Sequence, residues 1–120
     1  LAEQLAKNTT RPELKGLAQN ILSDEPKAIA ELYAWKKDWY GDTKNVRDPI
    51  VANLGPADDK FDLRFLNAMI AHHELGVIMT KETRQKSSRA EILNNADAVE
   101  IFLTNGLQAL KGLRSDWYKI

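Results

Sequence analysis

Two adjacent histidines, His72 and His73, lie between Met69 and Met79, the two methionines of the 120-residue chain. If the segment is helical, at about 100° per residue, the four side chains fall on one face roughly 120° wide. Met69 can reach a point shared with either histidine within one turn, whereas Met79 needs a second turn. Thioether and imidazole donors without a negative charge suit Cu(I), or Cu(II) through the histidines, better than calcium or magnesium. The pattern is therefore compatible with a site for a soft transition metal such as copper.

The same four residues also have a purely structural interpretation. Methionine at a core-facing helical position usually fills space, and a histidine there is more often a hydrogen-bonded core residue than a ligand. Two adjacent histidines weaken this interpretation without removing it. A di-iron centre of the ferritin kind is disfavoured, because no Glu-x-x-His tetrapeptide surrounds either histidine. From the residues alone, metal binding and core packing both stay open.

A long amphipathic helix is predicted between Arg11 and Gly41, where apolar residues recur every three or four positions. Thr10 is its predicted N-cap, and Pro12 stands in its first turn. Pro26 lies inside the pattern, yet the apolar phase continues across it, which predicts one kinked helix rather than two. The tryptophans share this phase and are predicted to pack rather than to form a ligand platform.

The remaining segments follow from composition and capping signals. Residues 41–60 contain glycine and proline without sustained periodicity and are predicted to be a linker. A third helix, which carries the histidines, is predicted to start near Asp58 or Asp59 and to end within 81–87. Carboxylates at its start, including Asp62, favour the positive end of the helix dipole. The run from Ser88 to Glu91 is typical of a capping box that opens a fourth helix.

An internal repeat organises these helices. Trp39-Tyr40 recurs as Trp117-Tyr118, an offset of 78 residues (117 minus 39), and the apolar positions of the second and fourth helices match at the same offset. The fold class is predicted to be all-α, a ferritin-like up-and-down helical bundle built from repeated two-helix units.

About one and a half copies of that unit are present. We expect one domain over 1–120, with 1–40 as the second half of repeat one, 41–60 as the linker and 61–120 as repeat two. The counterpart of the histidine helix is expected upstream of Leu1. Pairing of the two copies, or of two chains in a homodimer, is expected to supply the core.

Composition narrows the classes of partner. Seventeen basic and seventeen acidic residues give a formal charge of zero, so no basic field favours nucleic acid or an anionic membrane. No apolar run is long enough to span a bilayer, and the absence of cysteine excludes disulfides and thiolate sites. Ser87 and Ser88 have no histidine nearby in sequence, and no catalytic constellation is seen. We therefore predict a protein that is not an enzyme.

The chain also resembles a known family. The run Asp62-x-x-Phe65-x-x-x-Met69-Ile70-x-His72-His73-x-x-Gly76-x-x-Met79 is similar to the signature of the bacterial domain-of-unknown-function family 305, a ferritin-like helical family. The segment from Arg11 to Ile21 and the two Trp-Tyr endings resemble other parts of the family pattern. The resemblance covers nearly the whole chain and implies that the first His-His helix of the family is missing here.

The resemblance carries functional expectations. Family members are typically exported, periplasmic or cell-surface proteins, and some resemble copper-binding proteins rich in methionine and histidine. It implies that Met69, His72, His73 and Met79 are the metal-binding candidates and that copper is sequestered or delivered. Where the family tends to have methionine in the later helix, this chain has Leu32 and Leu110 in its two copies, which limits the expectation to one weak site. The alternative is a structural or protein-interaction bundle that binds no metal.

Overall fold

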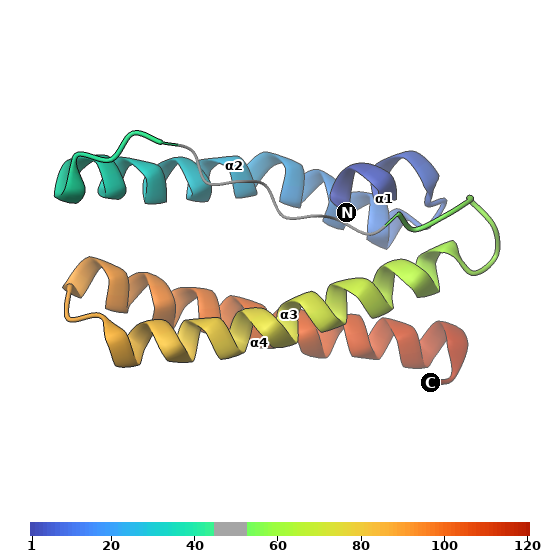
Figure 1. Ribbon diagram of the computed structural model, residues 1–120. Coiled ribbons are helices and arrows are strands. Elements are labelled where there is room, and N and C mark those ends of the chain that lie inside the picture. The colour runs from blue at the N-terminus through green and yellow to red at the C-terminus, as the bar shows by residue number, and fades with distance from the viewer. Residues whose placement is uncertain (45–52) are drawn as a thin grey trace. The chain divides into compact units, whose positions relative to one another are not determined.

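The computed structural model describes residues 1–44 and 53–120, and every regular element within these ranges is an α-helix. The four helices are α1 (Ala2–Asn8), α2 (Pro12–Tyr40), α3 (Phe61–Lys86) and α4 (Ala90–Tyr118) (Figure 1). The predicted all-α class is therefore confirmed. Residues 45–52 of the predicted linker lie outside the described residues. The chain divides into two compact units, Leu1–Phe61 and Asp62–Ile120, while the single domain over 1–120 stays a prediction.

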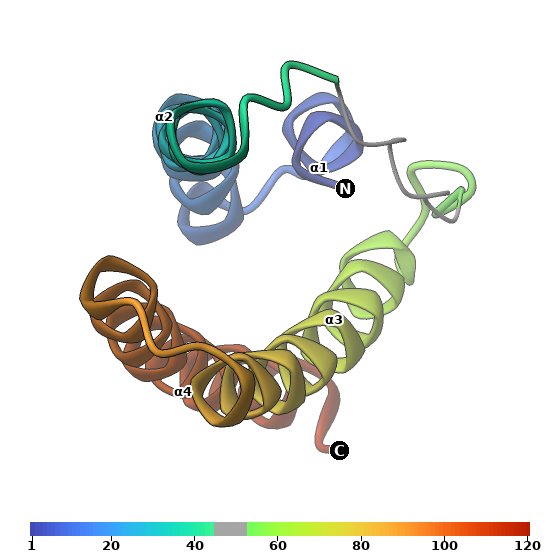
Figure 2. The ribbon, with the colours of Figure 1, turned by 60° about the vertical axis from the view of Figure 1, so that its left-hand side comes forward.

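In the first unit the short helix α1 lies beside the beginning of α2 (Figures 1 and 2). Leu5 on α1 and Leu14 on α2 are both without measurable exposure. After the undescribed residues the chain returns to α1, where the Leu54 amide donates to Gln4 Oε1 at 2.8 Å. These contacts give the first unit a small core at one end of α2.

The rest of α2 is less covered than its apolar pattern predicts. The apolar stripe predicted for this helix includes Leu22, Ile29 and Leu32, yet their exposed fractions are 43%, 45% and 46%. Within this unit the reason is length, because α1 has 7 residues and forms only about two turns against a 29-residue partner. Pro26 lies inside α2 without interrupting it, so the predicted continuity of the helix is confirmed.

In the second unit α3 and α4 form an antiparallel hairpin and lie side by side in both views (Figures 1 and 2). Near the turn, Arg84 of α3 donates to Asp97 of α4 at 2.9 Å. At the opposite end, Arg114 of α4 donates to Asn67 Oδ1 of α3 at 2.9 Å. The two helices therefore run along each other for most of their length. The buried apolar side chains of this unit are Phe65, Leu66, Met69, Ile70, Ala96 and Leu110.

The predicted N-cap of α2 is wrong. Arg11, not Thr10, occupies the N-cap position, and it makes no side-chain capping bond. The hydroxyl that bonds to the backbone at this helix start belongs to Thr9, one residue before the predicted cap: Thr9 Oγ1 accepts from the Arg11 amide at 3.3 Å. Pro12 opens the helix as predicted, and its missing N–H removes one donor that would need a cap.

The predicted capping box before α4 is wrong in the same way. Arg89 is the N-cap, and it makes no side-chain capping bond. The hydroxyl that bonds to the backbone here belongs to Ser87 rather than Ser88, since Ser87 Oγ accepts from the Arg89 amide at 3.3 Å. Thr9 and Ser87 differ by the repeat offset of 78. In both copies, therefore, a turn precedes the helix in which a Thr or Ser hydroxyl accepts from the backbone amide two residues later, and no side-chain cap is formed.

The repeat itself is confirmed by the helix boundaries. Helices α2 and α4 each have 29 residues, and both of their ends differ by 78 positions. Their C-caps also correspond, since Gly41 (φ 64°) and Lys119 (φ 63°) both adopt the left-handed conformation. The Trp-Tyr pairs that revealed the repeat stand immediately before these caps. The fold is thus built from a repeated two-helix unit.

Helix α3 begins at Phe61, slightly later than predicted. Asp58 closes the turn that precedes it, accepting from the Lys60 amide at its side chain (3.0 Å) and from the Phe61 amide at its carbonyl (3.2 Å). Asp62 lies in the first turn of α3, and the dipole role predicted for the acidic residues there stays a prediction. None of the helices in the described ranges has a stretch that is both long and apolar enough for a membrane span.

Candidate metal centre

His73 lies in the middle of α3, on the side that meets α4, and is half-buried. Its Nδ1 lies 2.9 Å from the carbonyl oxygen of Met69, one turn earlier. A carbonyl can only accept, so this bond requires the proton on Nδ1 and leaves the lone pair of the neutral ring on Nε2. Metal-binding histidines are commonly oriented by a bond of this kind from their other ring nitrogen.

The environment also favours the neutral ring. Burial lowers the pKa of His73 below its ordinary value of 6.5; the bond to the Met69 carbonyl raises it, and the nearby His72 lowers it. A neutral imidazole at neutral pH is the form that binds a metal ion. The state of His73 therefore fits the donor role predicted for it.

Two glycines shape the space around this histidine. A Cβ added to Gly106 of α4 would lie 3.1 Å from His73 Nε2 and 3.3 Å from its Cδ2. A Cβ added to Gly76 of α3 would lie 2.8 Å from Leu103 Cδ1 of α4. Each helix thus offers a glycine to a side chain of the other, which allows the two backbones to approach closely.

The other three predicted ligands occupy different environments. Met69 is buried, with an exposed fraction of 6%, whereas Met79 is 56% exposed and His72 is also exposed. The structure joins the His73 ring to the backbone carbonyl of Met69. Their assignment as ligands stays a prediction. Across residues 1–44 and 53–120, no group of three or more histidine, aspartate or glutamate side chains is arranged to hold a metal ion.

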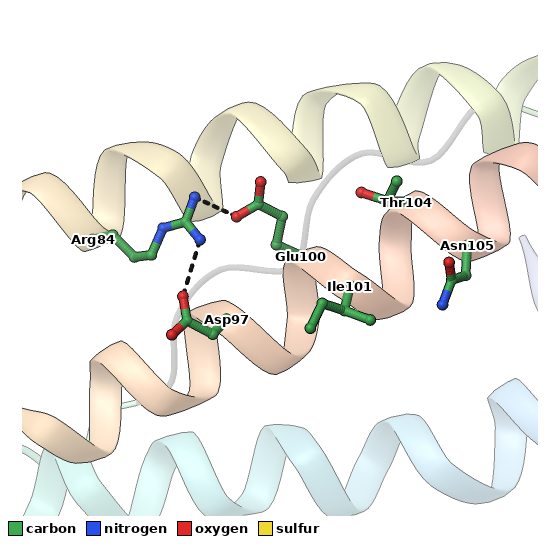
Figure 3. A pocket seen from close by; sticks show the side chains of 6 residues that line it. All are labelled: Arg84, Asp97, Glu100, Ile101, Thr104 and Asn105. Carbon is green, nitrogen blue, oxygen red and sulfur yellow. Dashed lines mark hydrogen bonds and ion pairs between the residues drawn. The ribbon is translucent and has the colours of Figure 1, made fainter.

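A second polar arrangement lies toward the turn of the hairpin. Arg84 reaches from α3 to α4 and pairs with both Asp97 and Glu100 (Figure 3). These three side chains line an open depression of about 480 Å³ together with Ile101, Thr104 and Asn105. The guanidinium already occupies the two carboxylates, so the depression is better explained as a tie between the helices than as a cation site.

Sequence reasoning missed Gly106 and Arg84. Gly106 had a detectable signal, because it lies in phase with the apolar stripe of α4, where a glycine often marks a close approach. Arg84 had none, since its partners Asp97 and Glu100 are identified only by the register of the hairpin. Trp35 and Trp39 stack on each other with centroids 5.5 Å apart, and both are half-buried. That the tryptophans serve only to pack the helices stays a prediction.

Comparison with known proteins places this geometry in a context. The chain is similar to solved structures of CopM. The Cu(I)-bound form matches with a TM-score of 0.85 and 25% sequence identity, over 98% of this chain and 84% of the CopM chain. The Ag-bound form obtained by co-crystallization has a TM-score of 0.84 at 26% identity, and the apo form 0.84 at 27%, with the same coverage. No curated protein matches the chain. The model of the family described as "Domain of unknown function (DUF305)" matches residues 47–114, more than half of the sequence, and we conclude that the chain belongs to the DUF305 family.

Proposed function

We propose that this chain is a non-enzymatic helical protein that binds copper through α3 and acts in copper sequestration or delivery. The observation that carries the proposal is the likeness to CopM, whose structures include Cu(I)-bound, Cu(II)-bound and Ag-bound forms. That likeness extends over 98% of the chain, and the histidine helix lies within the matched family segment. An exported location, periplasmic or extracellular, is part of the proposal and rests on the family resemblance.

His73 is the proposed principal ligand, because its Nδ1 is held by the Met69 carbonyl and its Nε2 is the nitrogen left to donate. His72 is the second ligand. As its side chain is exposed, it can turn toward an ion held near α3 without breaking a packed contact.

The thioethers have unequal roles in this proposal. Met79 is exposed and free to adopt a new rotamer, whereas Met69 is buried and would have to leave its packed position. We therefore assign Met79 as the thioether that adds affinity for Cu(I), and Met69 as a weaker support. Soft thioether donors favour Cu(I), while the two imidazoles also serve Cu(II).

The proposal is tested by titrating the purified chain with Cu(II), and with Cu(I) under reducing conditions, beside a His72→Ala/His73→Ala variant. We expect uptake near one ion per chain in the wild type and a loss of at least about tenfold in affinity in the variant. Gln85→Ala, an exposed position of the same helix, is the control and should bind like the wild type.

A second candidate function is a structural or interaction bundle without metal. It is favoured by one specific observation, the burial of Met69 together with the bond from His73 to its carbonyl, which are features of a packed core. Equal copper uptake by the wild type and the double variant would support this candidate and contradict the first. Separate His72→Ala and His73→Ala variants then show whether the half-buried or the exposed ring carries any binding that is seen.

A further inference from the structure

Gly106 of α4 lies against the imidazole of His73 at the edge that bears Nε2. A Cβ at position 106 would be 3.1 Å from Nε2 and 3.3 Å from Cδ2, closer than ordinary van der Waals contact. The other edge of the ring is fixed to α3, since Nδ1 bonds the Met69 carbonyl at 2.9 Å. The ring therefore has little freedom to move away from an added side chain without losing that bond.

We propose that Gly106 is a positioning residue for the metal site: by lacking a side chain, it lets His73 lie against α4 with Nε2 unobstructed. This inference rests on the proposed function. A metal ion bound to imidazole lies about 2.0 Å from the nitrogen, so it needs the space beside Nε2 that a Cβ would contest. Glycine at position 106 omits the Cβ that would contest that space, while Nδ1 stays engaged with the Met69 carbonyl.

The other helical glycines of the chain show that this role is specific. Gly16 of α2 and Gly112 of α4 have nothing within 4 Å of an added Cβ, and the atoms nearest to an added Cβ at Gly76 belong to the apolar side chain of Leu103. Gly106 is the helical glycine for which the nearest atom is a potential metal donor. At the corresponding position of α2, 78 residues earlier, the chain has Ala28. The helix of this repeat therefore does not require glycine there for its own formation, and the histidine supplies the reason in the second copy.

The test compares Gly106→Ala with Gly112→Ala, a matched glycine replacement in the same helix with open space around it. We expect Gly112→Ala to bind Cu(II) like the wild type. Gly106→Ala should keep its helical circular dichroism and lose about tenfold or more in Cu(II) affinity, the range seen when support around a metal ligand is removed. Unchanged affinity in Gly106→Ala overturns the proposal.

Two further measurements test the role of Gly106 separately from the proposed copper-binding function. In the metal-free protein, nitrogen-15 spectra should show the His73 ring with its proton on Nδ1, and that signature should change in Gly106→Ala but not in Gly112→Ala. If the His73 signature is unchanged in Gly106→Ala, the positioning role is overturned, whether or not the wild type binds copper. If the wild type takes up no copper, that result contradicts only the proposed function. In a His73→Ala background, Gly106→Ala should have no further effect on Cu(II) affinity, and an additive loss would show that Gly106 acts elsewhere.

Discussion

The two copies of the repeat share their long helix but differ in what accompanies it. Helices α2 and α4 have equal lengths, equivalent starts and equivalent left-handed C-caps. Beside α2 lies the 7-residue α1, whereas the 26-residue α3 runs along α4. The same helical pattern is thus sufficient to form the long helix in both copies.

The difference extends to the residues that join the helices. In the second copy, Arg84 ties α3 to Asp97 and Glu100 of α4. The positions 78 residues earlier hold Ala6, Gln19 and Leu22, which cannot form an ion pair. At the position of Gly106 the first copy has Ala28. The residues that join α3 to α4 in the second copy therefore have no equivalents of the same chemistry in the first.

The largest expected effect concerns the apolar stripes of α2 and α4, which are buried to different extents. Leu110 of α4 is 4% exposed, while Leu32, its equivalent in α2, is 46% exposed. Leu110→Ala should lower the free energy of unfolding by about 2–5 kcal/mol, the usual cost of a cavity in a packed core. Leu32→Ala should cost roughly 1 kcal/mol, because less apolar surface is withdrawn from water. Urea unfolding followed by circular dichroism measures both.

Leu103→Met, a volume-conserving change on the same stripe of α4, is the control and should cost less than about 1.5 kcal/mol. Equal losses for Leu32→Ala and Leu110→Ala would contradict the comparison. They would show that the stripe of α2 is as well covered in solution as that of α4.

A smaller effect is expected at the two helix ends. Gly41 and Lys119 adopt nearly the same left-handed φ, and each donates its amide to the carbonyl four residues earlier, at 2.8 Å and 3.0 Å. Lys119 has a Cβ that this conformation disfavours, so Lys119→Gly should raise the free energy of unfolding by about 0.5 kcal/mol. Gly41→Ala should lower it by about 1 kcal/mol for the same reason.

Thermal and urea unfolding of the two variants measure these changes. Lys119→Ala serves as the control, because it removes the charge and keeps the Cβ; it should give no gain. A gain equal to that of Lys119→Gly would assign the effect to charge and break the equivalence of the two caps.

The helices of both copies could be predicted from sequence because their apolar residues recur at helical spacing over nearly thirty positions. The caps could not, since Thr9 and Thr10, or Ser87 and Ser88, are adjacent hydroxyls and only the backbone geometry selects between them. The continuity of α2 across Pro26 was predicted correctly, because the apolar phase continued past it; the kink at Pro26 stays a prediction.

The candidate site was predictable only in part. The histidines and methionines are neighbours in sequence, so their presence on one helix followed from spacing alone. Their unequal burial did not, because it depends on which parts of the α3 surface are covered in the folded chain. The contact of His73 with Gly106 joins residues 33 positions apart (106 minus 73), and no local pattern identifies that register.

The smallest expected effect concerns pH and belongs to the second copy, since the chain's two histidines, His72 and His73, both lie in α3. Burial, with a contribution from His72, lowers the pKa of His73 from its ordinary value of 6.5, against the opposing bond to the Met69 carbonyl. The unfolded chain therefore binds a proton at this ring more readily than the folded chain does. The stability contributed by neutral His73 is present above pH 6.5 and is lost as the pH falls through the folded pKa.

Carbon-13 or nitrogen-15 titration of the metal-free protein should give His73 a midpoint below 6.5, and unfolding measured between pH 7.5 and about 5 should show a shallow loss of stability. His73→Gln keeps a hydrogen-bond donor near the Met69 carbonyl but cannot titrate in this range, so its stability should change less with pH. The loss is small because the ring is only half-buried and solvent screens its charge. A midpoint at or above 6.5 would mean that the bond to the carbonyl outweighs burial. The loss of stability toward low pH would then be absent or reversed in sign.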